Sequence, residues 1–142
     1  CAIGPRKRDL RPFCAPLTQL IVERMLATGV RRIVCLTCAM AGDLAANVAP
    51  APRARAALAC RRRPEVMADR GAQEAVLMRS ALDWTLVKPP RLTTASRSGT
   101  IHADVTLPVR LVDHIGRTDL AEFMFRAATQ DRFVRQRVYV RN

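Results

Sequence analysis

Apolar residues recur at helical spacing near the start of the chain, at Leu17, Leu20, Ile21 and Met25. This spacing predicts a helix from about Pro16 to Thr28. Proline suits the first turn of a helix, and Gly29 suits the stop that follows the last turn. The segment from Val30 to Thr37 is apolar after its two arginines, which predicts a strand buried on both faces of a parallel sheet. Helix and strand together form a first αβ unit.

The same order repeats in the second half of the chain. A helix is predicted from Pro64 to about Ala81, with one apolar stripe formed by Met67, Gly71, Ala75, Met78 and Leu82. Gly71 lowers the helix propensity but permits close approach to a sheet. Residues Trp84 to Val87 predict a second buried strand, which ends at Pro89 and Pro90. A second αβ unit therefore follows the first.

Two regions between these units are less regular. Residues 38–64 predict a long loop with one short helical turn around Ala54 to Ala59, and such long loops are usually functional or mobile. The segments Thr100–Val105 and Val109–Val112 predict short strands around turns, or an extended excursion on the substrate side.

The end of the chain predicts one more helix and strand. The helix begins near Thr118, with the stripe Leu120, Phe123, Met124, Ala127 and Ala128. Asp119 is interpreted as a residue of the helix start rather than as a catalytic acid. Val138–Val140 predicts the last strand. Alternating helices and strands indicate an α/β fold with a mainly parallel sheet.

Length and composition fit one globular domain. The 142 residues have the usual size of a single domain, and 49% of them are apolar. No apolar run reaches roughly 18 residues, the length that a membrane helix needs. No basic segment followed by an apolar stretch marks a secretory signal, although the first residue is Cys1 rather than Met. We therefore expect a cytoplasmic protein without a membrane partner.

Arginine dominates the charge. Lys and Arg total 24 against 12 Asp and Glu, a formal net charge of +12, and only Lys7 and Lys88 are lysines. Heavy use of alanine accompanies the arginine, as in proteins from G+C-rich genomes, so composition alone is one explanation. A basic surface also favours anionic ligands. Nucleic-acid binding is another possible explanation of the positive charge, and the residues that would carry it are Arg6, Lys7, Arg8, Arg53, Arg55 and Arg61–Arg63. Aromatic residues for base stacking are few and no single helix gathers the arginines, so nucleic acid is not the expected partner.

The five cysteines are an odd number without a regular framework, which fits a reducing compartment. Cys35 and Cys38 form a C-x-x-C pair at the end of a predicted strand, where positions three apart point to opposite faces. A redox pair is therefore not expected. His102 and His114 show no ligand spacing to a cysteine pair, so no zinc site is expected either.

Three stretches of the chain occur in this order in one protein family: Gly29–Ala39, Leu82–Thr93, and Arg117–Met124 with the closing Val138–Val140. The chain resembles the NAD(P)H-binding, NmrA-like atypical short-chain dehydrogenase/reductases, particularly the flavin reductase (biliverdin IXβ reductase) branch. The resemblance implies the C-terminal part of a Rossmann-like, doubly wound, mainly parallel sheet. Such a sheet binds NADP or NAD at the carboxyl ends of its strands.

Part of the family pattern is missing from the 142 residues. The G-x-x-G-x-x-G turn, which cradles the pyrophosphate at a helix N-terminus, is absent together with the first three strands. The opening Cys1–Arg6 resembles the end of the fourth strand and the turn after it. We therefore expect residues 1–142 to be a single NAD(P)-binding Rossmann-like domain that lacks its N-terminal strands and Gly-rich loop. As a partial or inactive fragment, it would need the missing half or a complementing chain.

The resemblance implies two groups of cofactor-binding residues. Gly4, Pro5 and Arg6 would lie beneath the nicotinamide-side ribose and diphosphate, with Arg6 as the anion contact, unless they form an ordinary turn. Thr37 and Cys38 would end the next strand, where the family places a Ser or Thr whose hydroxyl approaches the nicotinamide. Cys38 takes the serine position, and a thiol is a weak hydrogen-bond donor, so catalysis assisted by a hydroxyl departs from the family here. The alternative is that both residues simply end a buried strand.

The candidate catalytic residues are Cys38, Arg70 and Arg91. Arg70 and Arg91 fall where the flavin reductase branch carries polar or histidine side chains near the substrate. An arginine there could hold a carboxylate or phosphate by two hydrogen bonds, although surface arginines are the alternative. Pro89 and Pro90 would shape the nicotinamide pocket, or only end the strand.

The implied function is an NAD(P)H-dependent reductase that transfers a hydride to a flavin, a tetrapyrrole-like or a quinone-like acceptor. The Tyr-x-x-x-Lys pair of typical short-chain dehydrogenases is absent, because Tyr139 is the only tyrosine and lies near the end of the chain. Hydride transfer would then rely on the placement of cofactor and acceptor. A non-catalytic NmrA-like regulatory or redox-sensing module is the alternative, slightly favoured by Cys38.

The missing strands lead to a prediction about folding. A sheet edge and helix faces without partners favour aggregation, so the isolated chain is expected to fold poorly or to need the missing half. Thermal unfolding measures this, and sharp, cooperative unfolding of a pure monomer would contradict it. The sequence immediately upstream of Cys1 is expected to contain a strand followed by G-x-x-G-x-x-G.

Overall fold

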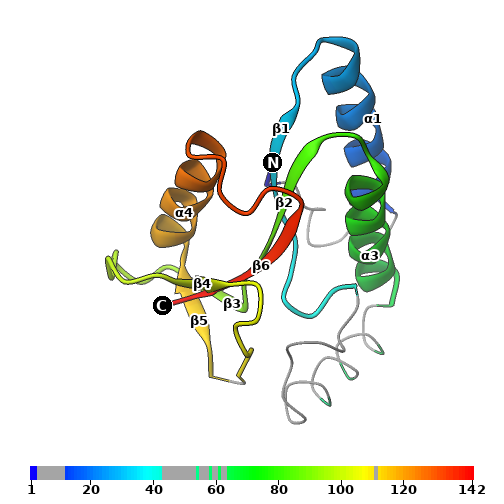
Figure 1. The fold of residues 1–142 in the computed structure, drawn as a ribbon. Helices are drawn as coiled ribbons and strands as arrows, with labels where there is room; N and C mark the ends of the chain where they lie inside the picture. The colour runs from blue at the N-terminus through cyan, green and yellow to red at the C-terminus, as the bar shows by residue number, and fades with distance from the viewer. Residues whose placement is uncertain (3–11, 43–53, 55–57, 59–60, 62–63, 111) are drawn as a thin grey trace.

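A computed structural model describes residues 1–2, 12–42, 54, 58, 61, 64–110 and 112–142. Their elements in chain order are α1 (Cys14–Ala27), β1 (Arg32–Leu36), α3 (Pro64–Arg79), β2 (Asp83–Lys88), β3 (Arg91–Thr93), β4 (His102–Asp104), β5 (His114–Gly116), α4 (Arg117–Thr129) and β6 (Gln136–Arg141). The fold is α/β, with α1 and α3 on one face of the sheet and α4 on the other (Figure 1). The predicted fold class is confirmed.

The main sheet has the strand order β1-β2-β6-β4. β1 pairs with β2, and β2 with β6, in parallel, while β4 runs antiparallel to β6. Cys1 lies along β1, where its amino group donates to the carbonyl of Val34 and its carbonyl accepts from the amide of Leu36 at 2.8 Å. Since parallel strands end at the same edge, the carboxyl ends of β1 and β2 lie together.

The apolar stripe predicted for the last helix forms the core on the α4 face of the sheet. Leu120, Phe123 and Ala127 are buried against Val34, Val87 and Val138 of the strands, whereas Ala128 is exposed. The helix begins at Arg117, one residue before the prediction. Hydrophobic periodicity succeeds here because the inward face of α4 is apolar.

The stripes predicted for the other two helices are correct only in part, because Ile21, Met25 and Leu82 lie in or against the core but the most buried helix residues are others. In α3 the buried residues are Asp69, Gln73, Glu74 and Leu77, while Met78 of the predicted stripe is 44% exposed. In α1 the buried residues are Cys14, Thr18 and Val22, while Leu20 is 46% exposed. Polar side chains face inward because each finds a buried partner; for example, the Gln73 amide donates to the Thr18 hydroxyl at 3.2 Å.

The second of the predicted short strands is misplaced. The segment Val109–Val112 forms no strand in its described residues; the strand falls at His114–Gly116 and pairs in parallel with Arg91–Thr93. The turn predicted at Ala54–Ala59 lies largely outside the described residues. In the part of the chain that the structure describes, no helix has the length and apolar character to span a membrane.

Asp69 of α3 caps the N-terminus of α1. Its carboxylate accepts the amides of Phe13, Cys14 and Ala15 at 3.1, 2.7 and 2.9 Å. Burial alone would raise the pKa of Asp69, but these three N–H donors together lower it below its ordinary value. A helix N-terminus carries free N–H groups and a partial positive charge, so the carboxylate joins α1 to α3.

Replacing Asp69 by Asn is therefore expected to destabilise the fold by about 1–3 kcal/mol at neutral pH, because the charged acceptor is lost. Since the pKa of Asp69 is depressed in the folded state, its stabilisation is present above the unfolded pKa and is lost as pH falls through the folded pKa. The difference between wild type and D69N should thus shrink in acid. Urea unfolding across pH measures it.

Asp83→Asn serves as the matched control, because the Asp83 carboxylate is partly exposed and the ion pair that it makes within the described residues, with Arg31, is long at 3.9 Å. This variant should change the free energy of unfolding by about 0.5 kcal/mol or less. Equal effects of D69N and D83N would contradict the capping role.

Candidate functional site

The segment that follows β1 continues its pairing with β2. The amide of Thr37 donates to the carbonyl of Val87 at 2.9 Å, and the amide of Ala39 donates to the carbonyl of Pro89 at 2.9 Å. Ala39 is buried against Tyr139 and Val109, which lie in β6 and in the segment between β4 and β5. The chain is therefore held in place where it leaves β1 at the carboxyl edge of the sheet. We refer to this segment, residues 37–42, as the β1 corner.

The hydroxyl of Thr37 is the unusual group of this corner. Thr37 is only 6% exposed, and its Oγ1 has no hydrogen-bond partner within the described residues. The other buried threonine hydroxyls are satisfied: Thr85 donates to the carbonyl of Phe133 at 2.8 Å, and Thr18 accepts from Gln73. A buried polar group without a partner is destabilising, so the Thr37 hydroxyl is a candidate for hydrogen bonding to a ligand at this edge.

Cys38 is half-buried, and its Sγ accepts the amide of Met40 at 3.4 Å. The first cysteine of the C-x-x-C motif, Cys35, is fully buried in the core beneath α1 and α3. Burial raises the pKa of the Cys35 thiol to about 11. A thiol held in that form is a poor nucleophile, which agrees with the expectation that the two cysteines are not a redox pair.

Lys88, which the pattern analysis did not single out, is the last residue of β2 and is fully buried. Its Nζ lies 2.5 Å from Oε1 of Glu74 and donates to the carbonyl of Ala41 at 2.8 Å. Burial lowers the pKa of Lys88 below its ordinary value, and Glu74 partly offsets this. Nζ of Lys88 lies over the ring of Tyr139, 6.0 Å from the ring centre. The sequence does contain one sign that Lys88 has a special role, because a lysine ends an apolar strand in a chain whose other basic residues are nearly all arginine.

Arg70 of α3 lies at the carboxyl end of β1. Its Nη1 donates to Oε1 of Gln73 at 2.9 Å and to the carbonyl of Leu36 at 3.5 Å. The structure therefore places Arg70 beside the residue that precedes Thr37, with part of its guanidinium held by the protein.

Arg91 begins a row of basic side chains on adjacent strands. Arg91 pairs with His114 across β3 and β5, and His102 pairs with Arg141 across β4 and β6. The amide of Asn142 donates to the carbonyl of His114 at 3.0 Å, which brings the end of β6 beside β5. We call Arg91, His114, Arg141 and His102 the basic row.

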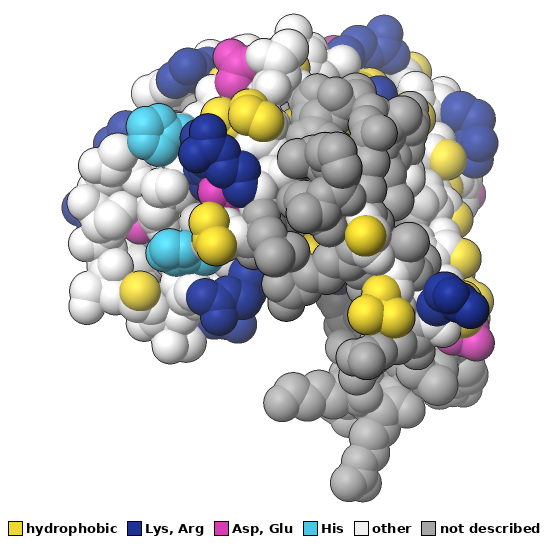
Figure 2. Space-filling view, turned by 90° about the horizontal axis from the view of Figure 1, so that it is seen from below, with side chains coloured by type: hydrophobic (Ala, Val, Ile, Leu, Met, Phe, Trp, Pro, Cys, Tyr) yellow, Lys and Arg dark blue, Asp and Glu magenta, His cyan; other side chains and the backbone are white. Residues whose placement is uncertain are grey.

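The basic row faces away from α4. The residues that alternate with it, Leu92, Ile115, Val140 and Ala103, all pack in the core beneath α4. Side chains alternate between the faces of a strand, so the basic row lies on the face that also carries Lys88 and Tyr139. Figure 2, seen from below onto the carboxyl edge, shows both histidines in cyan with Lys or Arg side chains beside them.

Two charges of the basic row differ in their pairing. Arg141 makes a 3.0 Å ion pair with Asp113, whereas the exposed side chain of Arg91 makes no hydrogen bond or ion pair within the described residues. A free guanidinium on this face can bind an anionic ligand.

The remaining predicted residues separate into two groups. Pro89 is buried and Pro90 half-buried, both at the end of β2, and Pro89 accepts the amide of Ala39. Gly4, Pro5 and Arg6 lie outside the described residues. The predicted cofactor residues that can be compared, Thr37, Cys38, Pro89 and Pro90, therefore meet at one edge.

Asp119 is fully buried in the first turn of α4, as its interpretation as a helix-start residue requires. It accepts from the amide and hydroxyl of Ser98 and from the side-chain amide of Asn142 at 2.8–3.0 Å. These bonds, the Ser98 amide first, lower the pKa of Asp119 against the opposing effect of burial. Asp119 thus joins the loop before β4 to the end of β6.

Among the described residues, no three His, Cys, Asp or Glu side chains gather in a way that could hold a metal ion.

Several solved structures share this fold. The anaerobilin reductase ChuY from Escherichia coli O157:H7 superposes with a TM-score of 0.76 and 17% identity over 97% of this chain and 60% of its own. A short-chain dehydrogenase/reductase from Veillonella parvula, solved in complex with NADP, gives 0.72 and 15% over 89% and 57%. A Streptococcus pneumoniae protein provisionally assigned as an NADH-flavin reductase gives 0.67 and 12% over 99% and 69%.

The chain thus spans about 60% of the length of these proteins, and at these identities the likeness concerns the fold. No curated protein matches the sequence. Residues 1–131, nearly the whole chain, match the model of the family described as NAD(P)H-binding. The chain therefore belongs to the NAD(P)H-binding family, and its carboxyl edge lies where a Rossmann-like sheet receives a dinucleotide.

Proposed function

We propose that this chain carries the nicotinamide-side part of an NADPH- or NADH-dependent reductase. The observation that carries the proposal is the buried, unpartnered hydroxyl of Thr37 at the carboxyl edge of β1. It fits a dinucleotide because the nicotinamide carries an amide that can exchange hydrogen bonds with a hydroxyl. Bound NADPH would supply a hydride to an acceptor.

The residues present would hold only one end of the cofactor. Thr37 and Cys38 would contact the nicotinamide side, while Pro89 and Pro90 would form the wall of the pocket. The Gly-rich turn that binds a pyrophosphate is not among the 142 residues. The whole reductase activity therefore needs that half, supplied by the missing N-terminal strands or by a complementing chain.

Charge favours one class among the possible acceptors. Arg91 is the free cation of the basic row, and flavin mononucleotide and tetrapyrroles carry phosphate or carboxylate groups, whereas quinones are neutral. We therefore assign Arg91 to the anionic group of the acceptor, and Arg70, partly held by Gln73 and Leu36, to a supporting position. Catalysis would consist of placing the two reactants, since Tyr139 is buried in the sheet.

A non-catalytic NmrA-like sensor is the second candidate, favoured by Cys38 in the place of a serine. Steady oxidation of NADPH with a flavin acceptor by the completed protein would rule out this alternative.

If the Thr37 hydroxyl binds the nicotinamide, its removal should weaken NADPH binding and leave the stability of the fold nearly unchanged. Thr37→Val removes an unpartnered hydroxyl, so the free energy of unfolding should change by less than about 1 kcal/mol. NADPH affinity, measured by nicotinamide fluorescence, should fall about tenfold, equivalent to about 1.4 kcal/mol. The matched control is Thr85→Val, which should destabilise by about 0.5–1.5 kcal/mol and leave the affinity unchanged. These affinities are measured on the completed protein, and absence of NADPH binding to its wild-type form at millimolar cofactor would reject the proposed function.

The Arg91 assignment predicts a change in acceptor preference. Arg91→Gln should raise the KM for flavin mononucleotide about tenfold and leave the KM for riboflavin, which lacks the phosphate, unchanged. Arg79→Gln, at an exposed arginine of α3, is the control. Equal effects of R91Q on both flavins would contradict the role of Arg91, and steady-state kinetics of the completed protein measures them.

A further inference from the structure

The ion pair between Lys88 and Glu74 is fully enclosed, with Lys88 0% and Glu74 2% exposed. Taking two charges out of water is expensive, and a buried ion pair rarely stabilises a fold more than two apolar side chains of similar size. Its presence is better explained by the geometry that it imposes. The group that Lys88 holds besides Glu74 is the carbonyl of Ala41, in the β1 corner.

Three consecutive residues hold this corner: the last two of β2, Val87 and Lys88, and Pro89, which follows the strand. Val87 and Pro89 accept the amides of Thr37 and Ala39, and between them Lys88 reaches Ala41. The backbone bonds to β2 reach only Thr37 and Ala39, while the amide of Ala41 donates within the corner to the carbonyl of Cys38 at 3.1 Å. The Lys88 side chain extends the contact with β2 to the far end of the corner.

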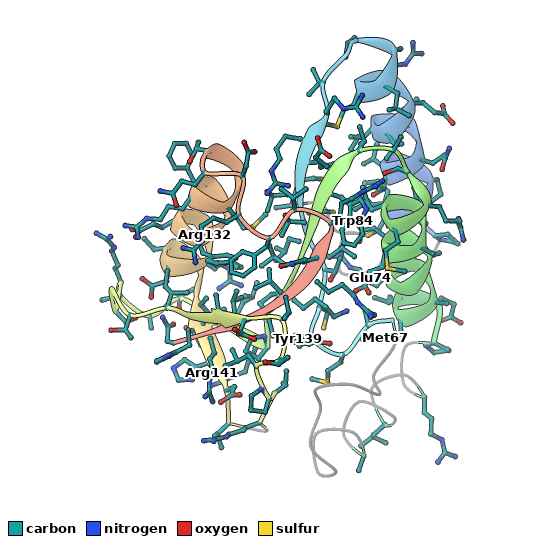
Figure 3. All side chains as sticks on the ribbon, in the orientation of Figure 1. Met67, Glu74, Trp84, Arg132, Tyr139 and Arg141 are labelled. Atoms are coloured by element: carbon teal, nitrogen blue, oxygen red, sulfur yellow. The ribbon has the colours of Figure 1, made fainter. Side chains whose placement is uncertain are left out.

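Gly42 brings the same corner against Glu74. Its φ is +68°, in the left-handed region that favours glycine, and a Cβ at this position would overlap the Glu74 carboxylate. Glu74 therefore contacts the corner directly as well as through Lys88. Figure 3 shows Glu74 reaching from α3 toward the sheet, on the side of Tyr139.

We infer that the Lys88–Glu74 pair is a positioning device that fixes the β1 corner, and with it the Thr37 hydroxyl and Cys38, for a bound dinucleotide. The part of this inference that concerns the cofactor rests on the proposed function. Neither side chain touches the ligand, because both are enclosed. The pair acts through the backbone of residues 41 and 42.

The test separates local order from overall stability. In K88M/E74M both charges are removed with little change in volume, so no unpaired charge stays buried. In the completed protein, amide hydrogen exchange at Ala39 and Ala41, followed by NMR, should accelerate at least tenfold, while the β1 and β2 amides change less than twofold. The NADPH dissociation constant should rise at least tenfold.

Two further variants make the result specific. Gln73→Met removes a buried polar side chain next to Glu74 that does not reach the corner, and it should leave exchange at Ala39 and Ala41 unchanged. Gly42→Ala displaces the corner from Glu74 while keeping both charges, and it should reproduce the local acceleration.

Each outcome decides the inference. Unchanged exchange at Ala39 and Ala41 in K88M/E74M would overturn it, as would equal acceleration in β1 and β2, which would make the pair a general support of the fold. If amide exchange at Ala39 and Ala41 accelerates but the NADPH affinity stays unchanged, the pair does not position the corner for the cofactor, and that part of the inference would be overturned. If wild type bound no NADPH, the proposed function would fail, and the exchange ratio alone would still decide whether the pair fixes the corner.

Discussion

The candidate site depends on a parallel register that continues past the end of its first strand. β1 ends at Leu36, yet Thr37 and Ala39 keep donating to the carbonyls of Val87 and Pro89. A backbone held in this way can leave a hydroxyl such as that of Thr37 buried and unpartnered, because the chain is not free to turn it toward another acceptor. A ligand-binding corner is thereby built from strand pairing rather than from a flexible loop.

The polar interior beneath α1 and α3 supports this corner. Asp69 caps α1, Gln73 bonds Thr18, and Glu74 pairs with Lys88, all from the inward face of α3. Each of these polar groups fixes a direction or a distance between two elements, which an apolar side chain at the same position would not do. The opposite face, beneath α4, is apolar and carries none of these links to the β1 corner.

The sequence could predict one half of this arrangement better than the other. The α4 stripe and the strands β1, β2 and β6 follow from hydrophobic periodicity, because their buried faces are apolar. The rotation of α3 does not follow, since its buried faces carry Asp69 and Glu74, whose partners are distant in the chain. Likewise, the family resemblance pointed to Thr37 and Pro89, whereas Lys88 emerged only when the fold brought it to Glu74. Gly4, Pro5 and Arg6 lie outside the described residues, so their roles remain predictions.

The central claim is that a dinucleotide binds at the carboxyl edge formed by the β1 corner and the end of β2. Titration of the completed, ¹⁵N-labelled protein with NADPH, followed by amide chemical shifts, measures this binding directly. The account predicts saturable shifts concentrated in residues 37–42 and 86–92, with α1 and the far end of α4 unaffected. Shifts concentrated on the outer faces of α1 and α3, or no saturable shift at all, would contradict it.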